Sequence, residues 1–225
     1  ADLTSATVTA STTDASSSLE SLWDGRSETT WHSGTIADEQ WLQIDFGQLT
    51  EFGGLVIDWD TVDYARSYGI ELSNDGRDWT TAYTVEDNAV SRSYVYLPDT
   101  EARLVRLNLR RSSQGNGYGI ASLSVEPYRF SATPNDFFSS IARDSRPGFY
   151  PRYFTGEQSY WTVAGTAAGQ NEALINEDGM VEVREGAFSV EPFLYLDGEF
   201  LTANDVERSQ SLFGEYLPIP SVAWE

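Results

Sequence analysis

The chain has 225 residues, of which 40% are hydrophobic and 13% aromatic, so it can bury a core and is not a disordered chain. Its 35 acidic residues outnumber 14 basic residues, all of them arginine, and the net charge of −21 disfavours nucleic acid and anionic membrane surfaces as partners. There is no cysteine, which excludes disulfides, thiolate metal ligands and cysteine nucleophiles.

Short strands separated by turns are predicted from the N-terminus to residue 127. Residues 41–47 alternate apolar with polar side chains, as a half-buried strand does. The predicted strand 68–73 ends at an Asn-Asp-Gly turn. Further strands are predicted at 55–59, 79–85, 93–97, 104–109 and 120–126. About seven or eight antiparallel strands in a segment of this length indicate a β-sandwich or barrel.

The second half of the chain begins with a predicted helix. Thr133 is a suitable N-cap, Pro134 suits the first helical position, and Asp136 follows three residues after the cap. The helix is expected to end near Arg143. Strands then resume at 159–164, 172–175, 180–183, 188–196, 199–202 and 217–224, with an Asp197-Gly198 hairpin turn between two of them. We therefore predict an all-β chain with one short helix, divided into domains 1–127 and 128–225.

A set of short motifs in the first half carries a family resemblance. They are Leu22-Trp23-Asp24-Gly25, Thr29-Thr30-Trp31, the strand 41–47, Tyr68 to Gly76 with Trp79, Ala102 to Leu107, and Gly117 to Ile120. This part resembles the discoidin, or coagulation factor V/VIII C-type, domain family, which overlaps family-32-type carbohydrate-binding modules. The resemblance implies a discoidin-like jelly-roll β-sandwich. Trp31, Trp41 and Trp79 are expected to be core aromatics.

The resemblance also implies a structural Ca²⁺ beside the Asp-Gly loop, where Asp24 and Thr29 match the family's ligand positions. Calcium needs hard oxygen ligands. Two positions depart from the pattern: Arg26 stands where a neutral or acidic residue is usual, and Ser122 stands where a glutamate completes the cage. The alternative is that Arg26 pairs with Asp24 and replaces the ion.

Members of this family bind ligands on loops at one end of the sandwich. Sugar recognition needs an aromatic plane for the ring face and polar groups for the hydroxyls. The loops 32–38, 60–64 and 111–118 supply both, with Tyr64 and Tyr118 as candidate planes. The candidate ligand-binding residues are His32, Asp60, Asp63, Tyr64, Arg111, Gln114, Asn116 and Tyr118. The alternatives are a structural role for His32, the single histidine, and solvated loops that bind nothing.

The second half resembles, more weakly, the lead-in to the β-sandwich that precedes an (α/α) barrel in some bacterial glycoside hydrolases. The resemblance rests on the aromatic and arginine-rich run 145–153 and the aromatic residues of 158–161. It implies that 128–225 is the start of a larger β-sandwich domain. Acidic residues are plentiful here, but nothing in the sequence pairs two of them across a cleft, as a glycosidase requires. The chain itself is therefore expected to be non-catalytic.

We thus expect a non-catalytic carbohydrate-binding module that targets an attached glycoside hydrolase to polysaccharide. Its expected partners are carbohydrate and the remainder of the same larger polypeptide. The alternatives are a protein-interaction or adhesion module and a purely architectural domain. The start Ala1-Asp2-Leu3-Thr4 looks like a mature end, so we expect a secreted or periplasmic protein of bacterial origin. No apolar run reaches the length of about 18 residues that a membrane span requires.

Overall fold

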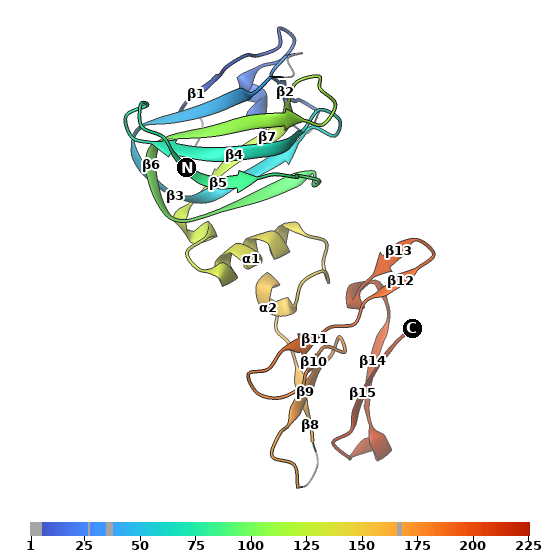
Figure 1. Ribbon diagram of the computed structural model, residues 1–225. Helices are drawn as coiled ribbons and strands as arrows, with labels where there is room; N and C mark the ends of the chain where they lie inside the picture. The colour runs from blue at the N-terminus through green and yellow to red at the C-terminus, as the bar shows by residue number, and fades with distance from the viewer. Residues whose placement is uncertain (1–5, 27, 35–37, 166–167) are drawn as a thin grey trace. The chain divides into compact units, whose positions relative to one another are not determined.

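The computed structural model describes residues 6–225 except 27, 35–37 and 166–167 (Figure 1). The chain divides into two compact units, Ala1–Phe137 and Phe138–Glu225. Among the described residues, no helix combines the length and the apolar character that crossing a membrane would require.

The first unit contains a seven-stranded antiparallel sheet with the order β2-β7-β3-β6-β4-β5 and with β1 beside β3. The strands are β1 Thr7–Ala10, β2 Trp31–His32, β3 Gln40–Trp59, β4 Ala65–Ser73, β5 Thr80–Val85, β6 Arg92–Ser112 and β7 Gly119–Glu126. Two 3-10 helices, η2 Leu19–Leu22 and η3 Tyr128–Phe130, lie before β2 and after β7.

Two long strands turn this sheet into a sandwich. The predicted strands 41–47 and 55–59 are the two halves of β3, whose register with β6 shifts after Asp45 and again after Phe52. The first half of β3 pairs with β1 and with the end of β6, and the second half pairs with β7 and with the start of β6. Each long strand therefore belongs to both layers that face each other in Figure 1.

The core lies between these layers and contains Trp31, which is fully buried as predicted. The prediction that Trp41 and Trp79 are core residues is wrong. Leu42 faces the core, and side chains alternate along a strand, so Trp41 faces the opposite way. The guanidinium carbon of Arg106 lies 5.1 Å from the ring centroid of Trp41 and 3.8 Å from that of Trp79. This cation–π contact covers both half-buried indoles on the outside of the sheet.

The helix α1, Pro134–Asp144, begins where the sequence predicts it. The Thr133 hydroxyl accepts a hydrogen bond from the Asp136 amide at 3.1 Å, as an N-cap does. The unit boundary lies at 137/138 instead of 127, because residues after β7 still pack on the first unit. Phe130 is buried, and the Phe137 ring lies 4.9 Å from that of Tyr96.

The second unit consists of a four-stranded sheet, β11-β10-β9-β8, and two separate two-stranded ribbons. Its strands are β8 Trp161–Ala164, β9 Ala173–Asn176, β10 Val181–Glu182, β11 Ser189–Val190, β12 Leu194–Leu196, β13 Glu199–Leu201, β14 Arg208–Leu212 and β15 Pro220–Trp224. Its short helices are α2 Arg152–Thr155, η4 Ala203–Asp205 and η5 Phe213–Glu215. The helix α2 and the strand β14 are not predicted, since four residues carry no helical period and β14 is mostly polar.

The described part of the second unit buries only three apolar side chains, those of Ala142, Met180 and Ala203. Its large apolar side chains are instead exposed, among them Tyr195 at 74% and Tyr216 at 79%. Burial of apolar surface is the main favourable term in folding. The second unit therefore lacks the kind of core that holds the first unit together.

Candidate functional site

Four loops meet at one end of the first unit, which we call the rim. The rim consists of the loops 11–17, 60–64 and 111–118 and of a fourth loop, of which the structure describes residues 31–34 and 38–39. The Asp14 amide donates to the His32 carbonyl at 2.9 Å, and the Asp60 amide donates to the Gly119 carbonyl at 3.1 Å. The structure thus brings the described parts of the predicted loops together, while residues 35–37 of the predicted loop 32–38 lie outside the described residues. It adds the loop 11–17, which the sequence did not mark as part of the site.

His32 and Asp60 lie on either side of Gly119, as their strand positions dictate. His32 pairs with Gly119 between β2 and β7. A Cβ atom placed on Gly119 would lie 2.8 Å from His32 Cε1 and 2.5 Å from the Asp60 Cβ. Only glycine fits between the two side chains, and both candidates occupy one small part of the rim.

The loop 60–64 is shaped by an aspartate turn. Asp60 Oδ1 accepts hydrogen bonds from the amides of Val62 at 2.8 Å and of Asp63 at 2.7 Å. The loop is tied to its neighbour because the Ser113 amide donates to the Tyr64 carbonyl at 2.9 Å. Asp63 Oδ1 is buried and has no hydrogen-bond partner among the described residues.

The prediction that Tyr118 presents its ring to a sugar is wrong. Tyr118 is 1% exposed and belongs to the core cluster. It lies two residues before Ile120, a fully buried residue of β7, and side chains two apart in an extended segment share one face. That alternation was the signal available in the sequence. Tyr64 is half-buried and packs against the same core, which leaves only part of its ring accessible.

The Tyr118 hydroxyl lies under the rim. It is buried and has no hydrogen-bond partner among the described residues. Burial raises the pKa of this hydroxyl, and the carboxylates of Glu39 and Asp38 raise it further. The charges of Asp38 and Glu39, which directly precede β3, are therefore felt by the buried Tyr118 hydroxyl.

The loop 111–118 offers amides to solvent, whereas its arginine is already engaged. Gln114 and Asn116 are exposed. The Ser112 hydroxyl donates to the Gly117 carbonyl at 2.7 Å and fixes the turn between them. The Arg111 guanidinium donates to the Glu86 carbonyl and lies 3.4 Å from the Asp87 carboxylate. Among Arg111, Gln114 and Asn116, the three polar side chains of this loop that were predicted to contact sugar, Arg111 is thus the least available.

The predicted metal ligands Asp24 and Thr29 lie together, at 2.9 Å between the Thr29 hydroxyl and Asp24 Oδ2. Arg26 contacts Asp24 through its backbone amide at 2.8 Å. Calcium takes about six to eight oxygen ligands. The described residues hold no group of three or more acidic or histidine side chains suited to a metal. The side chains present do not fit a complete calcium cage, and calcium remains a prediction of the resemblance.

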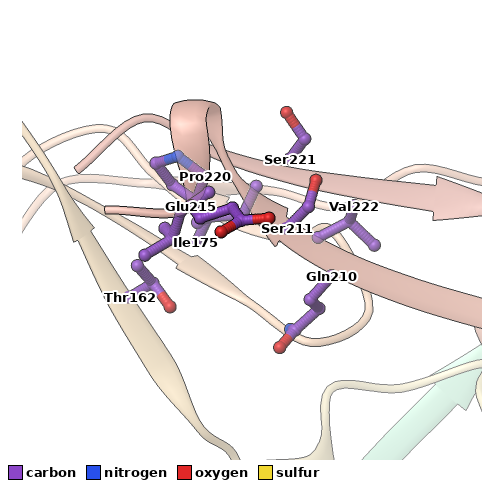
Figure 2. Close-up of a pocket in the computed structure, with 9 residues that line it drawn as sticks. Thr162, Ile175, Gln210, Ser211, Glu215, Pro220, Ser221 and Val222 are labelled. Atoms are coloured by element: carbon purple, nitrogen blue, oxygen red, sulfur yellow. The ribbon is translucent and has the colours of Figure 1, made fainter. Parts of the chain in front are cut away.

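The second unit has a pocket of about 230 Å³ between the sheet and the β14–β15 ribbon (Figure 2). Its polar lining comes from hydroxyls and amides such as Ser211, Ser221 and Gln210. Glu215 is the single carboxylate among the lining residues. Acid–base hydrolysis of a glycoside uses two carboxylates across one cleft, so this pocket has no catalytic pair.

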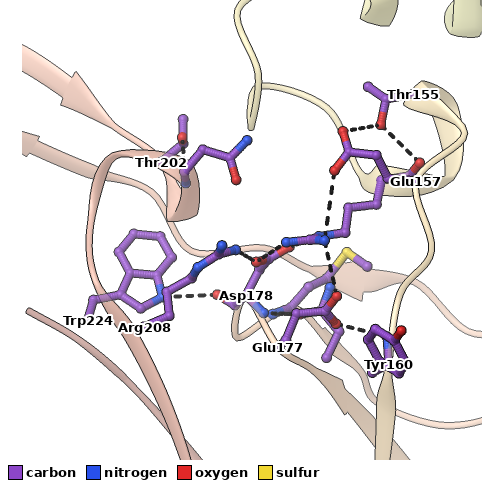
Figure 3. Close-up of polar contacts among 12 residues, drawn as sticks. Thr155, Glu157, Tyr160, Glu177, Asp178, Thr202, Arg208 and Trp224 are labelled. Carbon is purple, nitrogen blue, oxygen red and sulfur yellow. Dashed lines mark hydrogen bonds and ion pairs between the residues drawn. The ribbon is translucent and has the colours of Figure 1, made fainter.

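An ionic cluster in the second unit is occupied by its own members (Figure 3). Asp178, whose side chain is 9% exposed, accepts a hydrogen bond from Arg152 Nε at 2.6 Å and another from the Arg208 guanidinium. Glu177 lies 3.3 Å from Arg152, and the Trp224 indole donates to the Asp178 carbonyl at 3.0 Å. The cluster joins α2, the β9–β10 turn, β14 and β15, which is a structural role.

The family model described as F5/8 type C domain matches residues 7–123. Chitosan-binding module 1 of a chitosanase/glucanase from Paenibacillus sp. IK-5 is 28% identical, with a TM-score of 0.50, over 54% of this chain and 94% of that one. Module 2 of the same enzyme, solved with chitotriose, is 24% identical, with a TM-score of 0.51, over 56% and 99%.

A GH29 fucosidase from Ruminococcus gnavus shares the fold at 19% identity and a TM-score of 0.50, over 55% of this chain and 25% of its own. At their levels of identity, the fucosidase and module 2 show the fold alone. A search of curated proteins finds no match.

Proposed function

Because the chain belongs to the F5/8 type C family, we propose that its first unit is a non-catalytic carbohydrate-binding module that contacts sugar at the rim. The observation that carries the proposal is the convergence of loops 31–34, 60–64 and 111–118 at one end of the sandwich. The similarity to a chitosan-binding module, at 28% identity, supports it.

The rim is an exposed surface and not a deep sugar pocket. The accessible groups are the amides of Gln114 and Asn116, the carboxylate of Asp60, and parts of His32 and Tyr64. An exposed surface of this kind buries little ligand area, and part of the interaction energy is lost in ordering side chains. We therefore propose weak binding of single sugars, which suffices to hold an attached catalytic domain near a polysaccharide.

The experiment is a glycan array followed by affinity gel electrophoresis of the full chain. The double variant Gln114→Ala, Asn116→Ala removes exposed amides that make no described contact with the fold. Gln48→Ala removes an exposed amide from the β3 bend, away from the rim. We expect retardation by the bound glycan to be lost in the double variant and kept in the control. A blank array would reject the proposal and favour protein recognition, the alternative for this fold.

We also propose that the second unit packs against the remainder of a larger polypeptide, in which a catalytic domain is attached. The support is its exposed apolar surface, which includes Phe188 at 70% and Tyr195 at 74%. Monomeric proteins seldom leave large apolar patches uncovered. A photo-crosslinking residue at position 195 of the longer natural protein should react with a peptide outside 1–225. Reaction only within 1–225 would contradict this proposal.

Because polysaccharides are met outside the cytoplasm, we propose that the protein is exported. Cell fractionation with an antibody to the first unit tests this. A signal confined to the cytoplasmic fraction would reject it.

A further inference from the structure

We infer that the pocket of the second unit is an anchor site for a lysine side chain of the polypeptide that packs against this unit. The inference rests on the proposal that further protein covers the second unit, and it names the side chain that the covering protein contributes. Residues 1–225 contain no lysine, so the anchoring lysine belongs to polypeptide outside them.

The pocket is built from two pairs of strands and one turn. Ser211 lies opposite Ser221 in the β14–β15 ribbon, and Thr162 lies opposite Ile175 in β8 and β9. Glu215 comes from the turn η5, and Figure 2 shows its side chain reaching into the middle of the lining residues. A single carboxylate is thus placed among side chains that come from the sheet and from the ribbon.

The backbone holds Glu215 in an unusual conformation. Its φ of +68° lies in the left-handed region, which residues other than glycine seldom adopt. The Phe213 amide donates to the Ile219 carbonyl at 3.1 Å, and the Leu217 amide donates to the Phe213 carbonyl at 3.1 Å. Unfavourable backbone conformations persist where the surrounding structure fixes them, often at binding sites. The turn therefore fixes the Glu215 carboxylate at the pocket.

The polar lining of the pocket is not used by the fold. Within the described chain, no side-chain hydrogen bond or ion pair is made by any of the polar lining residues, which are Thr162, Gln210, Ser211, Glu215 and Ser221. Asp178 and Asp205 of the same unit are, in contrast, paired with arginines. An unneutralised carboxylate surrounded by hydroxyl and amide groups thus remains available to a ligand.

The lining indicates a cation on an aliphatic stem. The lone carboxylate attracts cations and repels anions. No aromatic ring is among the lining residues, so the plane that sugar recognition uses is missing. Apolar side chains are present instead, namely Ile175, Leu212, Pro220 and Val222. The volume of about 230 Å³ is below the roughly 300–1,000 Å³ of drug-sized sites, so it suits a single side chain.

Lysine has the required shape and donors. Its ammonium is a compact charge with three N–H donors on a flexible four-carbon stem. Separate hydroxyl oxygens around one carboxylate suit these divergent donors better than they suit the planar fork of an arginine. The stem can lie along the apolar lining while the ammonium meets Glu215.

The surroundings of the pocket indicate that the lysine is part of a protein. Phe213, Tyr216 and Ile219 are exposed and belong to or adjoin the turn that carries Glu215. A free amine would leave these side chains uncovered, whereas a polypeptide buries them around a central anchor, as in other interfaces. Residues 138–225 hold 14 acidic side chains and five arginines, which favours a basic partner.

The first experiment is carbodiimide cross-linking of the longer natural protein. The reagent condenses a carboxylate with a lysine amine to an amide, with loss of water. Because 1–225 has no lysine, each lysine amide at Glu215 leads to a segment outside it. Mass spectrometry should find Glu215 joined to one lysine, and no such product at Glu185, an exposed glutamate between β10 and β11.

The second experiment is an NMR titration of the chain 1–225 with Nα-acetyl-lysine methylamide at about 0.15 M salt, where long-range attraction is screened. We expect shifts of the Ser211 and Ser221 amides, and none with the Nε-acetylated probe, which has no charge. Glu215→Gln should weaken binding about tenfold, because a charge-assisted contact is lost. Glu185→Gln makes the same change of charge elsewhere and should leave binding unchanged.

The outcomes separate this inference from the packing proposal. Photo-cross-links from position 195 to an outside segment, without a lysine amide at Glu215, leave the packing in place and overturn the lysine anchor. Probe binding without that amide shows a site for free amines and also overturns the anchor. Equal weakening by the two variants shows general charge attraction and overturns it as well. No outside product from either position rejects both the packing proposal and the anchor.

Discussion

Ser33 and Tyr118 hold two rim loops together through reciprocal hydrogen bonds. The Ser33 amide donates to the Tyr118 carbonyl at 2.9 Å, and the Tyr118 amide donates to the Ser33 hydroxyl at 3.0 Å. Both residues are buried. The clasp fixes the strand β2 and its loop against the start of β7, and thus sets the shape of the rim.

Ser33→Ala should destabilise the first unit by about 1–3 kcal/mol, because the Tyr118 amide then stays buried without a partner. Urea denaturation measures the change, and amide exchange locates it at the rim. Ser91→Ala, an exposed serine, is the matched control. An unchanged denaturation midpoint for Ser33→Ala would show that the clasp does not hold the loops.

Gly117→Ala should be more disruptive than a change of one methyl suggests. Gly117 has φ +99°, which side chains rarely adopt, and a Cβ there would lie 1.9 Å from the Gly34 carbonyl oxygen. The backbone must move, so we expect a lower melting temperature and weaker sugar binding. Gly115→Ala is the control, since its Cβ would meet no atom although its φ is also positive. If both variants lose similar stability and sugar binding, the positive φ causes the effect and the close contact with Gly34 does not.

The stability of the first unit should fall with acid partly through Asp58. Burial raises the pKa of this carboxyl, but hydrogen bonds from Arg92 and Ser122 outweigh it and hold the pKa below its usual range. Such a group stabilises the fold above its unfolded pKa, and this contribution is lost as the pH falls through the folded pKa.

Asp58→Asn should therefore cost about 1 kcal/mol at neutral pH, and the variant and the parent should converge once the pH falls below the lowered pKa of Asp58 in the folded protein. Urea denaturation at several pH values provides the comparison. A constant difference across the whole range would mean that the charge of Asp58 contributes nothing.

Asp178→Ala should selectively loosen the second unit. The change leaves the guanidiniums of Arg152 and Arg208, which are 20% and 28% exposed, without their shared carboxylate. Breaking a buried ion pair by removing one partner costs about 3 kcal/mol or more. Hydrogen exchange should show lost protection after residue 138 and none before 127.

Glu157→Gln is the control for that experiment. Glu157 is 51% exposed and lies 3.8 Å from the same arginine, so its loss should have little effect. If the two variants behave alike, the cluster is not what orders the second unit.

Ser122→Glu should give the chain a clear stabilising response to calcium. Ser122 and Asp58 line the same pocket as Gly25 and Arg26, so a glutamate there adds a carboxylate to the loop that carries Asp24. We expect Ca²⁺ to raise the melting temperature of the variant, and Asp24→Ala to abolish the rise. A natural chain whose melting temperature falls with EDTA would show that the loop binds calcium unaided.

Local sequence signals determined most elements of the first unit. The alternation of apolar and polar residues predicts the strands around Leu42 and Ile120, because every second side chain of a strand faces the core. The Thr133 cap fixed the start of α1 for an equally local reason. The same alternation, applied consistently, would have placed Trp41 outside and Tyr118 inside.

Tertiary structure alone decided how distant residues combine. The sequence by itself did not show that 41–47 and 55–59 form one strand that passes through both layers, or that Asp178 pairs with Arg152 and Arg208, which are 26 and 30 residues away. Local periodicity reports which face a side chain takes, whereas contacts between distant segments depend on how the chain closes on itself. The rim arises in this way, from loops far apart in the sequence that only the closed sandwich brings to one end.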